Sequence, residues 1–130
     1  MSVSREPVTV GKPWEQTVPF SLGIISTGRM LHTAGITARD AEGKVVGAGD
    51  MRAQIEQCFK NVGDVLRAAG ADYRDVVKWT MYTTDIREFS RHADVWRRYF
   101  VDRPASTLVE VRALVMPEMM VEIEAVVHLE

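Results

Sequence analysis

Cysteine is scarce in this sequence, and Cys58 is the only one. A single thiol excludes both an intrachain disulfide and a metal site built from several cysteines. Cys58 also falls on the apolar stripe of a predicted helix, where a cysteine behaves as a small hydrophobic residue. A catalytic thiol needs an exposed, electropositive setting instead. We therefore expect Cys58 to lie in the core.

Long apolar runs are missing as well. No stretch approaches the roughly 20 apolar residues that a membrane span needs. Residues 1–7 lack the apolar segment of a secretory signal. We expect a cytoplasmic protein without a membrane partner.

Histidine gives no sign of a metal site. His32, His92 and His128 are far apart and share no ligand spacing with one another or with a pair of carboxylates. We expect neither a metal nor an organic cofactor.

A strong charge of either sign is also absent. The formal net charge is -2, and the lysines and arginines are scattered rather than gathered into a stripe. Proteins that bind phosphate backbones usually carry a basic patch. The sequence therefore disfavours nucleic acid as a partner, and with it a ribonuclease.

What the sequence contains is the composition of an ordinary folded protein, with 46% apolar and 26% charged residues. It shows no internal repeat and no low-complexity run. A length of 130 residues is most simply one domain, spanning residues 1–130.

The first part of the chain predicts extended structure. Residues 1–19 mix Pro, Gly and polar groups around a short apolar stretch, which indicates an edge segment followed by a loop. The apolar runs 20–25 and 30–35 flank the turn-like sequence Ser-Thr-Gly-Arg at 26–29. This pattern predicts a β-hairpin.

The clearest helix is predicted over Met51 to Ala69, where apolar residues recur at spacings of three and four. Asp50 is a good N-cap, and Gly70 can close the helix in the left-handed conformation. The apolar stripe consists of Met51, Ile55, Cys58, Phe59, Val62, Val65, Leu66 and Ala69.

The remaining elements follow from similar patterns. A strand is predicted over Val76–Thr83. Asp85 can cap a second helix that ends before Pro104. Two final strands are predicted over 106–114 and 119–129. On the strand over 76–83, the residues expected to share one face are Val77, Trp79 and Met81. The apolar stripe of the second helix consists of Ile86, Phe89, Ala93, Trp96, Tyr99 and Phe100.

These elements predict an α+β, two-layer fold, in which a mixed sheet carries two helices on one face. The opposite face is expected to be apolar too, because the pattern places Leu108, Leu114, Met120 and Val126 on the same side as Glu122. A sheet that is apolar on both faces favours a homo-oligomer.

Several segments together resemble the RidA/YjgF family of enamine/imine deaminases. The resemblance is strongest in Pro-Ala-Ser-Thr-Leu-Val-Glu-Val at 104–111 and Val-Glu-Ile-Glu-Ala-Val-Val at 121–127. Weaker matches lie at 19–24, 31–36 and 54–78. The resemblance implies a chorismate-mutase-like fold, assembled as a homotrimer around a central barrel, with active sites between subunits.

The resemblance also implies roles for individual residues. Glu122 corresponds to the family's glutamate that holds the attacking water, and Gly35 to the glycine whose backbone meets the substrate. Ala34, Phe20 and Ser106 stand where the family usually has serine, tyrosine and the arginine that binds the substrate carboxylate. The other residues expected around the substrate are Thr107, Leu108 and Trp14.

The missing arginine leaves the source of a cation open. Arg112 would share a strand face with Ser106, but about 20 Å along it at roughly 3.3 Å per residue. Arg29 or Arg39, from a loop, could serve instead. Since serine cannot form arginine's bidentate bonds to a carboxylate, we expect a substrate other than the usual small α-imino acid.

The sequence therefore predicts a RidA-like hydrolytic deaminase that acts on a small enamine or imine and releases ammonia. The alternative is a non-catalytic trimer of the same fold that binds a small molecule or has a regulatory role. Glu124, on the same strand face as Glu122, is expected to be its better-solvated neighbour or a contact between subunits.

Overall fold

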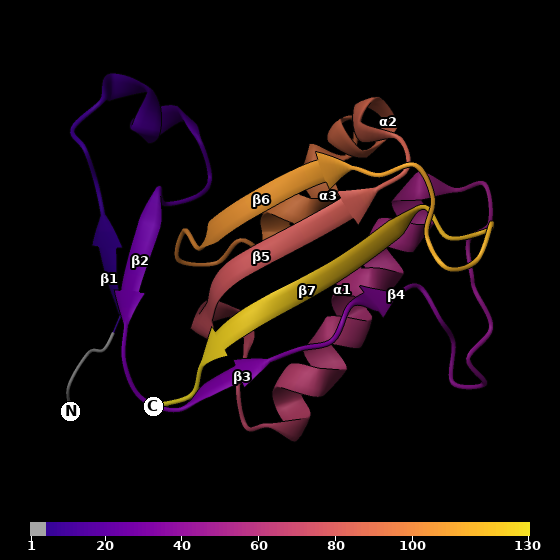
Figure 1. Cartoon of the computed structure of the whole chain (residues 1–130), viewed down its shortest axis with the longest axis horizontal. Helices are drawn as coiled ribbons and strands as arrows, with labels where there is room; N and C mark the ends of the chain where they lie inside the picture. Colours follow the sequence, from indigo (N-terminus) through magenta and orange to yellow (C-terminus); the bar gives the residue numbers. More distant parts are fainter. Residues whose placement is uncertain (1–4) are drawn as a thin grey trace.

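The computed structural model describes residues 5–130 and is built around a five-stranded mixed sheet (Figure 1). Its strands are β3 (Met30–His32), β4 (Ile36–Thr37), β5 (Val76–Thr83), β6 (Ala105–Glu110) and β7 (Val121–His128). β7 pairs with β5 on one side and with β3 and β4 on the other, and β6 forms the far edge. β6 runs parallel to β5, whereas every pair that includes β7 is antiparallel.

The two C-terminal strands are shorter than predicted, and Arg112 lies beyond the end of β6. The backbone N–H of Val111 still donates to the carbonyl of Thr83, at 2.8 Å, after which the chain leaves the sheet in a loop that contains Pro117. The expectation that Arg112 shares a strand face with Ser106 is therefore wrong.

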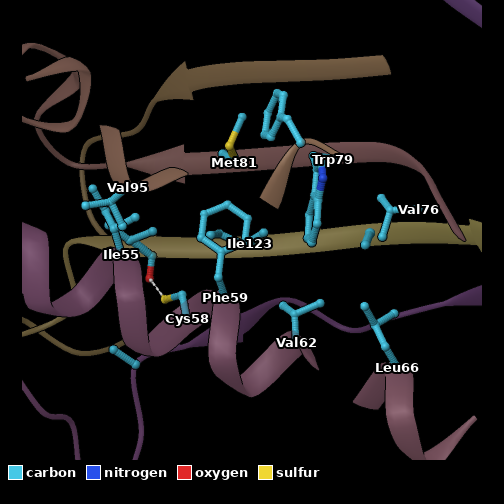
Figure 2. Close-up of a cluster of buried hydrophobic side chains, with 14 of the residues drawn as sticks. Ile55, Cys58, Phe59, Val62, Leu66, Val76, Trp79, Met81, Val95 and Ile123 are labelled. Atoms are coloured by element: carbon cyan, nitrogen blue, oxygen red, sulfur yellow. Dashed lines mark hydrogen bonds between the residues drawn. The ribbon is translucent and has the colours of Figure 1, made fainter. Parts of the chain in front are cut away.

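The long helix α1 (Met51–Ala68) forms as predicted. The Asp50 side chain accepts a hydrogen bond from the backbone N–H of Ala53, and Gly70 has a φ of 77° just beyond the helix. Most of the predicted stripe, including Phe59 and Leu66, is fully buried against the sheet (Figure 2), whereas Val65 is half-buried and Ala69 is exposed beyond the helix end. Burial of this stripe, rather than helix propensity, is the main stabilisation of such a helix.

The predicted second helix is divided into α2 (Ile86–Ser90), α3 (Ala93–Trp96) and the 3₁₀ turn η3 (Arg97–Tyr99). Asp85 caps α2 as expected, by accepting from the N–H of Glu88. The break falls at His92, whose φ of -105° and ψ of 33° are not helical, and whose ring lies 3.0 Å from the Glu88 carboxylate. The segments still pack on the same side of the sheet as α1, because Phe89 and Val95 belong to the same core.

Cys58 lies in that core, as predicted. Its side chain is fully buried, and its thiol donates to the carbonyl of Val121 (Figure 2). Burial raises the pKa of the Cys58 thiol, and the nearby Glu122 charge raises it further. The thiol is therefore held in its unreactive protonated form.

A separate two-stranded sheet joins β1 (Arg5–Val8) to β2 (Gly23–Ser26). It lies beside the start of β6 (Figure 1), and its strands are linked through the 3₁₀ turn η1 (Pro13–Thr17). Two arginines fix it to the main sheet, because Arg103 donates to the Phe20 carbonyl and Arg5 donates to the Val76 carbonyl.

The hairpin predicted between 20–25 and 30–35 is wrong, because β2 pairs with β1 whereas β3 pairs with β7. The C-terminal end of the chain determines this. The N–H of Arg29 donates to the Glu130 carbonyl at 2.7 Å, and a Cβ on Gly28 would lie 1.9 Å from that same oxygen. The turn is therefore packed against the end of β7, and β2 leaves in another direction.

The face of the sheet opposite the helices, called the open face below, is not the apolar surface that the pattern predicted. Leu108 pairs with Met81 in register and points toward the helices, and Leu114 lies outside the strands. Val126 does lie on the open face. Most of its neighbours there are polar, namely Lys78, Thr80, Tyr82, Thr107, Glu122 and Glu124.

Among residues 5–130, no helix combines the length and the apolar character required to cross a bilayer.

Candidate functional site

Glu122 is the second residue of β7 and points to the open face, where it is partly buried. Thr37 of β4 and Tyr82 of β5 are its partners on the two neighbouring strands. The central position of β7 fixes the backbone of Glu122 from both sides. Its carboxylate is thereby held at a fixed place near the β4 edge.

Gly35 lies directly against that carboxylate. A Cβ built on Gly35 would be 1.9 Å from Glu122 Oε2 and 2.8 Å from Cδ. No other residue type leaves this space, so the sequence requires glycine here for close approach rather than for a positive φ. We call Glu122 and Gly35 the acid site.

The segment that carries Gly35 is held in place by β7. The N–H of Thr33 donates to the Ala125 carbonyl at 3.0 Å, and the Thr33 hydroxyl accepts from the Ala125 N–H at 2.9 Å. The same hydroxyl donates to the carbonyl of Ala34, which is exposed beside Gly35. The predicted residues Ala34, Gly35 and Glu122 therefore lie together in one chain.

A second acidic residue accompanies the acid site. Glu124 lies on the open face, as predicted, and accepts a hydrogen bond from the Tyr82 hydroxyl. This hydrogen bond, followed by burial, raises the pKa of the Tyr82 phenol. Sequence reasoning missed Tyr82, although its alternation with Met81 in β5 already placed it on the face of Glu122.

The predicted residues of β6 lie elsewhere. Ser106 and Leu108 pair with Trp79 and Met81 and therefore point toward the helices, on the face opposite Glu122. Ser106 is also separated from Glu122 by two strand spacings across the sheet, which is about 10 Å. Along the strands the two residues are offset by three residues, which adds about another 10 Å. One chain does not bring Ser106 and Glu122 together.

Thr107 is the β6 residue that points to the open face. Its hydroxyl accepts a hydrogen bond from Lys78 Nζ at 2.8 Å, and its neighbour in register is Thr80. Thr80 is in turn paired with Glu124. Thr107 therefore shares a face with the acid site but lies across β5 from it.

Phe20 lies near the start of β6. The next residue, Ser21, donates its N–H to the Pro104 carbonyl at 3.1 Å, and the Phe20 ring packs partly against the core. Trp14, which the sequence placed at the wall of a cleft, is 49% exposed. We call Phe20, Ser106 and Leu108 the β6 group.

A surface hollow of about 530 Å³ borders the acid site through Gly35, whereas Glu122 is not part of its lining. It lies between β4, the loop after it and the exposed side of α1. Its lining contains one cationic side chain, Arg39, which sequence reasoning considered only as one of two loop arginines. The lining residues are Gly35, Ile36, Thr37, Arg39, Asp40, Ala41, Gln57, Asn61 and Asp64.

Metal-ligand side chains do not converge at either place. Within residues 5–130, no three His, Cys, Asp or Glu side chains come close enough together to hold a metal ion.

A comparison with models of known protein families identifies the family of this chain. The model described as endoribonuclease L-PSP matches residues 12–129, which include both the acid site and the β6 group. This chain belongs to that family, the RidA/YjgF family.

RidA/YjgF proteins of known name are similar over nearly the whole chain. A 2-iminobutanoate/2-iminopropanoate deaminase from Homo sapiens is 29% identical over 126 residues, covering 96% of this chain and 90% of its own. The deaminase of the same name from Bos taurus is 33% identical over 116 residues, covering 88% and 78%.

A solved structure of a Rid family protein of unknown function from Yersinia pestis has a TM-score of 0.88 and 31% identity, covering 98% of this chain and 100% of that chain. These matches confirm the predicted family and its α+β fold.

Proposed function

We propose that this RidA/YjgF protein is a hydrolytic deaminase that converts a small imine or enamine into a carbonyl compound and releases ammonia. The observation that carries the proposal is the Glu122 carboxylate, held against the Gly35 backbone at the border of a surface hollow. It is supported by relatives that are named 2-iminobutanoate/2-iminopropanoate deaminases.

The proposed reaction needs one acid-base group and one water. The water oxygen bonds to the imine carbon while the C=N electron pair moves to nitrogen, which gains a proton. The carbinolamine then expels ammonia as its hydroxyl loses a proton and becomes the carbonyl. In this scheme Glu122 orients the water, accepts its proton and returns it to the leaving nitrogen.

The proposal also includes a homotrimer. If the β6 group contributes to the site, it must come from a second copy, because Ser106 and Glu122 lie on opposite faces of the sheet in one chain. The contacts of Thr107 and Trp14 with the substrate stay predictions from the sequence, because Thr107 lies on the face of β6 opposite Ser106. A single domain over residues 1–130 and a cytoplasmic location stay predictions from the sequence.

The test is ammonia release from imines formed in place. An amino-acid oxidase working on alanine or 2-aminobutyrate supplies the imino acid continuously, and the protein is added at increasing concentration. We expect the initial rate of ammonia release to exceed the spontaneous rate and to rise with added protein until it equals the rate at which the oxidase forms the imine. A rate equal to that with serum albumin, for every amino acid supplied, would reject the deaminase.

The second candidate is a trimer that binds a small molecule without converting it. Ser106 favours it, because a serine there removes the guanidinium that the family uses for the substrate carboxylate. Binding of pyruvate, seen by calorimetry, together with no ammonia release would support this candidate. An RNA substrate, incubated in parallel, tests the activity that the family description names.

A further inference from the structure

Arg39 is a cation beside the acid site whose position is fixed by hydrogen bonds. It is exposed at the wall of the hollow, and its Nε donates to the Thr37 hydroxyl at 3.2 Å. Its Nη1 donates to the Gly43 carbonyl at 3.2 Å. A guanidinium carries five N–H donors, so about three remain for a ligand.

The backbone around Arg39 is fixed by α1. Asn61 Nδ2 lies 2.9 Å from the carbonyl of Thr37 and 2.9 Å from that of Arg39, and donates to both. Gln57 in turn donates to the Asn61 side chain at 2.8 Å. A rigid helix thus holds the segment from which the guanidinium extends, so that little ordering is needed when a ligand binds.

Arg39 and Glu122 share Thr37 as a neighbour and are not paired with each other. Thr37 is the partner of Glu122 in register, so their Cβ atoms are about 4.5–5.5 Å apart. Arg39 donates to the Thr37 hydroxyl, so Arg39 and Glu122 are both direct neighbours of Thr37. Across residues 5–130 Arg39 nevertheless forms no ion pair. The Arg39 guanidinium therefore has no carboxylate partner among these residues, and it bonds to the same Thr37 that neighbours Glu122.

The other charges in the hollow are already engaged. Asp40 Oδ1 accepts from the backbone N–H groups of Glu42 and Lys44, at 2.9 and 3.0 Å. Asp64 forms an ion pair with Arg67 at 2.8 Å. Arg39 is therefore the one cation in the lining, and neither carboxylate of the lining is paired with it.

Arg29, the other loop arginine, does not share this position. It lies at the opposite end of β7, where it pairs with Glu130 at 3.7 Å.

We propose that Arg39 binds the carboxylate of an anionic imine, in place of the arginine that Ser106 replaces. This rests on the proposed function. The substrate then carries a carboxylate after all, held from the β4 edge rather than from β6, with its imine carbon turned toward Glu122. Arginine suits this role because its planar fork forms two charge-assisted bonds to one carboxylate.

The test compares an anionic with a neutral imine in the full-length protein. Arg39→Gln should raise KM for the imine of alanine about tenfold or more, while kcat changes less than about threefold, because a lost ground-state contact acts on binding. KM for the uncharged imine of benzylamine should not change. Arg39→Lys should restore part of the affinity, and Arg87→Gln, an exposed arginine on α2, should behave as wild type.

Equal effects of Arg39→Gln on both imines, or no effect on either, would overturn the proposal while leaving the deaminase intact. If the wild type converts neither imine, the proposed function fails instead. Calorimetric titration with pyruvate then decides on Arg39 alone. At least tenfold weaker binding by Arg39→Gln, with an unchanged melting temperature, supports it, whereas equal or absent pyruvate binding rejects it.

Discussion

Gly35→Ala should disable the acid site without unfolding the protein. The added Cβ would lie 1.9 Å from Glu122 Oε2, whereas ordinary contact begins at about 3.4 Å. The carboxylate must therefore retreat by about 1.5 Å. It is the far end of a flexible side chain, so it can move without displacing backbone.

The expected magnitude follows from that displacement. A misplacement of about 1 Å can lower a rate about 10²-fold, which corresponds to roughly 2.7 kcal/mol of transition-state stabilisation. Gly35 has no positive φ, so alanine adds no backbone strain. A Gly-to-Ala change at a compatible position alters stability by less than about 1 kcal/mol. Activity should therefore fall much further than stability.

Two other glycines provide matched controls. In Gly23→Ala the new Cβ meets only Val8, at an ordinary 3.7 Å, so activity and melting temperature should both stay near wild type. In Gly63→Ala it would lie 2.2 Å from the Tyr73 hydroxyl, inside the fold. That variant should lose stability while its folded fraction keeps full kcat.

The assay is kcat/KM for imine hydrolysis, measured beside thermal melting, for each variant and for the double change Gly35→Ala with Glu122→Gln. Because both changes act through one carboxylate, the double variant should be about as slow as Glu122→Gln alone. The reasoning would be refuted by a stable Gly35→Ala protein with wild-type kcat/KM, or by losses that multiply in the double variant.

Three further predictions concern assembly and stability. Light scattering at micromolar concentration should give three times the chain mass of 14.6 kDa, and a monomer mass would contradict the shared site. Burial raises the pKa of Tyr73 and Tyr99, and the hydrogen bond to Glu124 raises the pKa of Tyr82. As the pH rises, these phenols therefore lose their protons in the unfolded chain before they lose them in the folded protein. The urea concentration at the midpoint of unfolding should stay constant up to about pH 10 and fall above it, and the fall should be smaller in Tyr82→Phe. A midpoint that does not change above that pH would argue against these pKa shifts. Hydrogen bonds from the Thr9 hydroxyl, at 2.6 Å, and from backbone N–H groups lower the pKa of Glu15. The ionised Glu15 side chain therefore stabilises the folded protein above about pH 4.5, and this stabilisation is lost as the pH falls. Glu15→Gln should therefore lower the melting temperature at pH 7 but make little difference well below pH 4, and equal melting of both proteins at pH 7 would be inconsistent with that.

Local patterns predicted the parts of the fold that depend on local chemistry. The stripe of α1, its Asp50 cap and the alternation of β5 from Trp79 onward follow from residue spacing. At the start of β5 a register shift between Val76 and Lys78 brings Val76, rather than the predicted Val77, into the core cluster. Glu122 and Glu124 share a face for the same reason, because side chains alternate along a strand.

Pairing between distant segments was not predictable in the same way. The prediction of a hairpin around 26–29 was wrong because β3 pairs with β7, about a hundred residues later in the chain, and because Glu130 packs on Gly28. Leu108 was placed on the wrong face since its direction depends on its parallel register with Met81 of β5. The Arg39 hollow likewise depends on α1 meeting β4, a contact that no local pattern records.

The central claim is that Glu122 carries the chemistry, and Glu122→Gln tests it most directly. This change keeps the shape of the side chain but removes its charge and its capacity to accept a proton. The measurement is kcat/KM for the best imine of the wild type, with Glu118→Gln, an exposed glutamate in the loop before β7, as the control.

We predict that Glu122→Gln lowers kcat/KM about 10²-fold or more, the usual share of a positioned acid-base group, while Glu118→Gln matches the wild type. A folded Glu122→Gln protein that hydrolyses the imine at the wild-type rate would contradict the account.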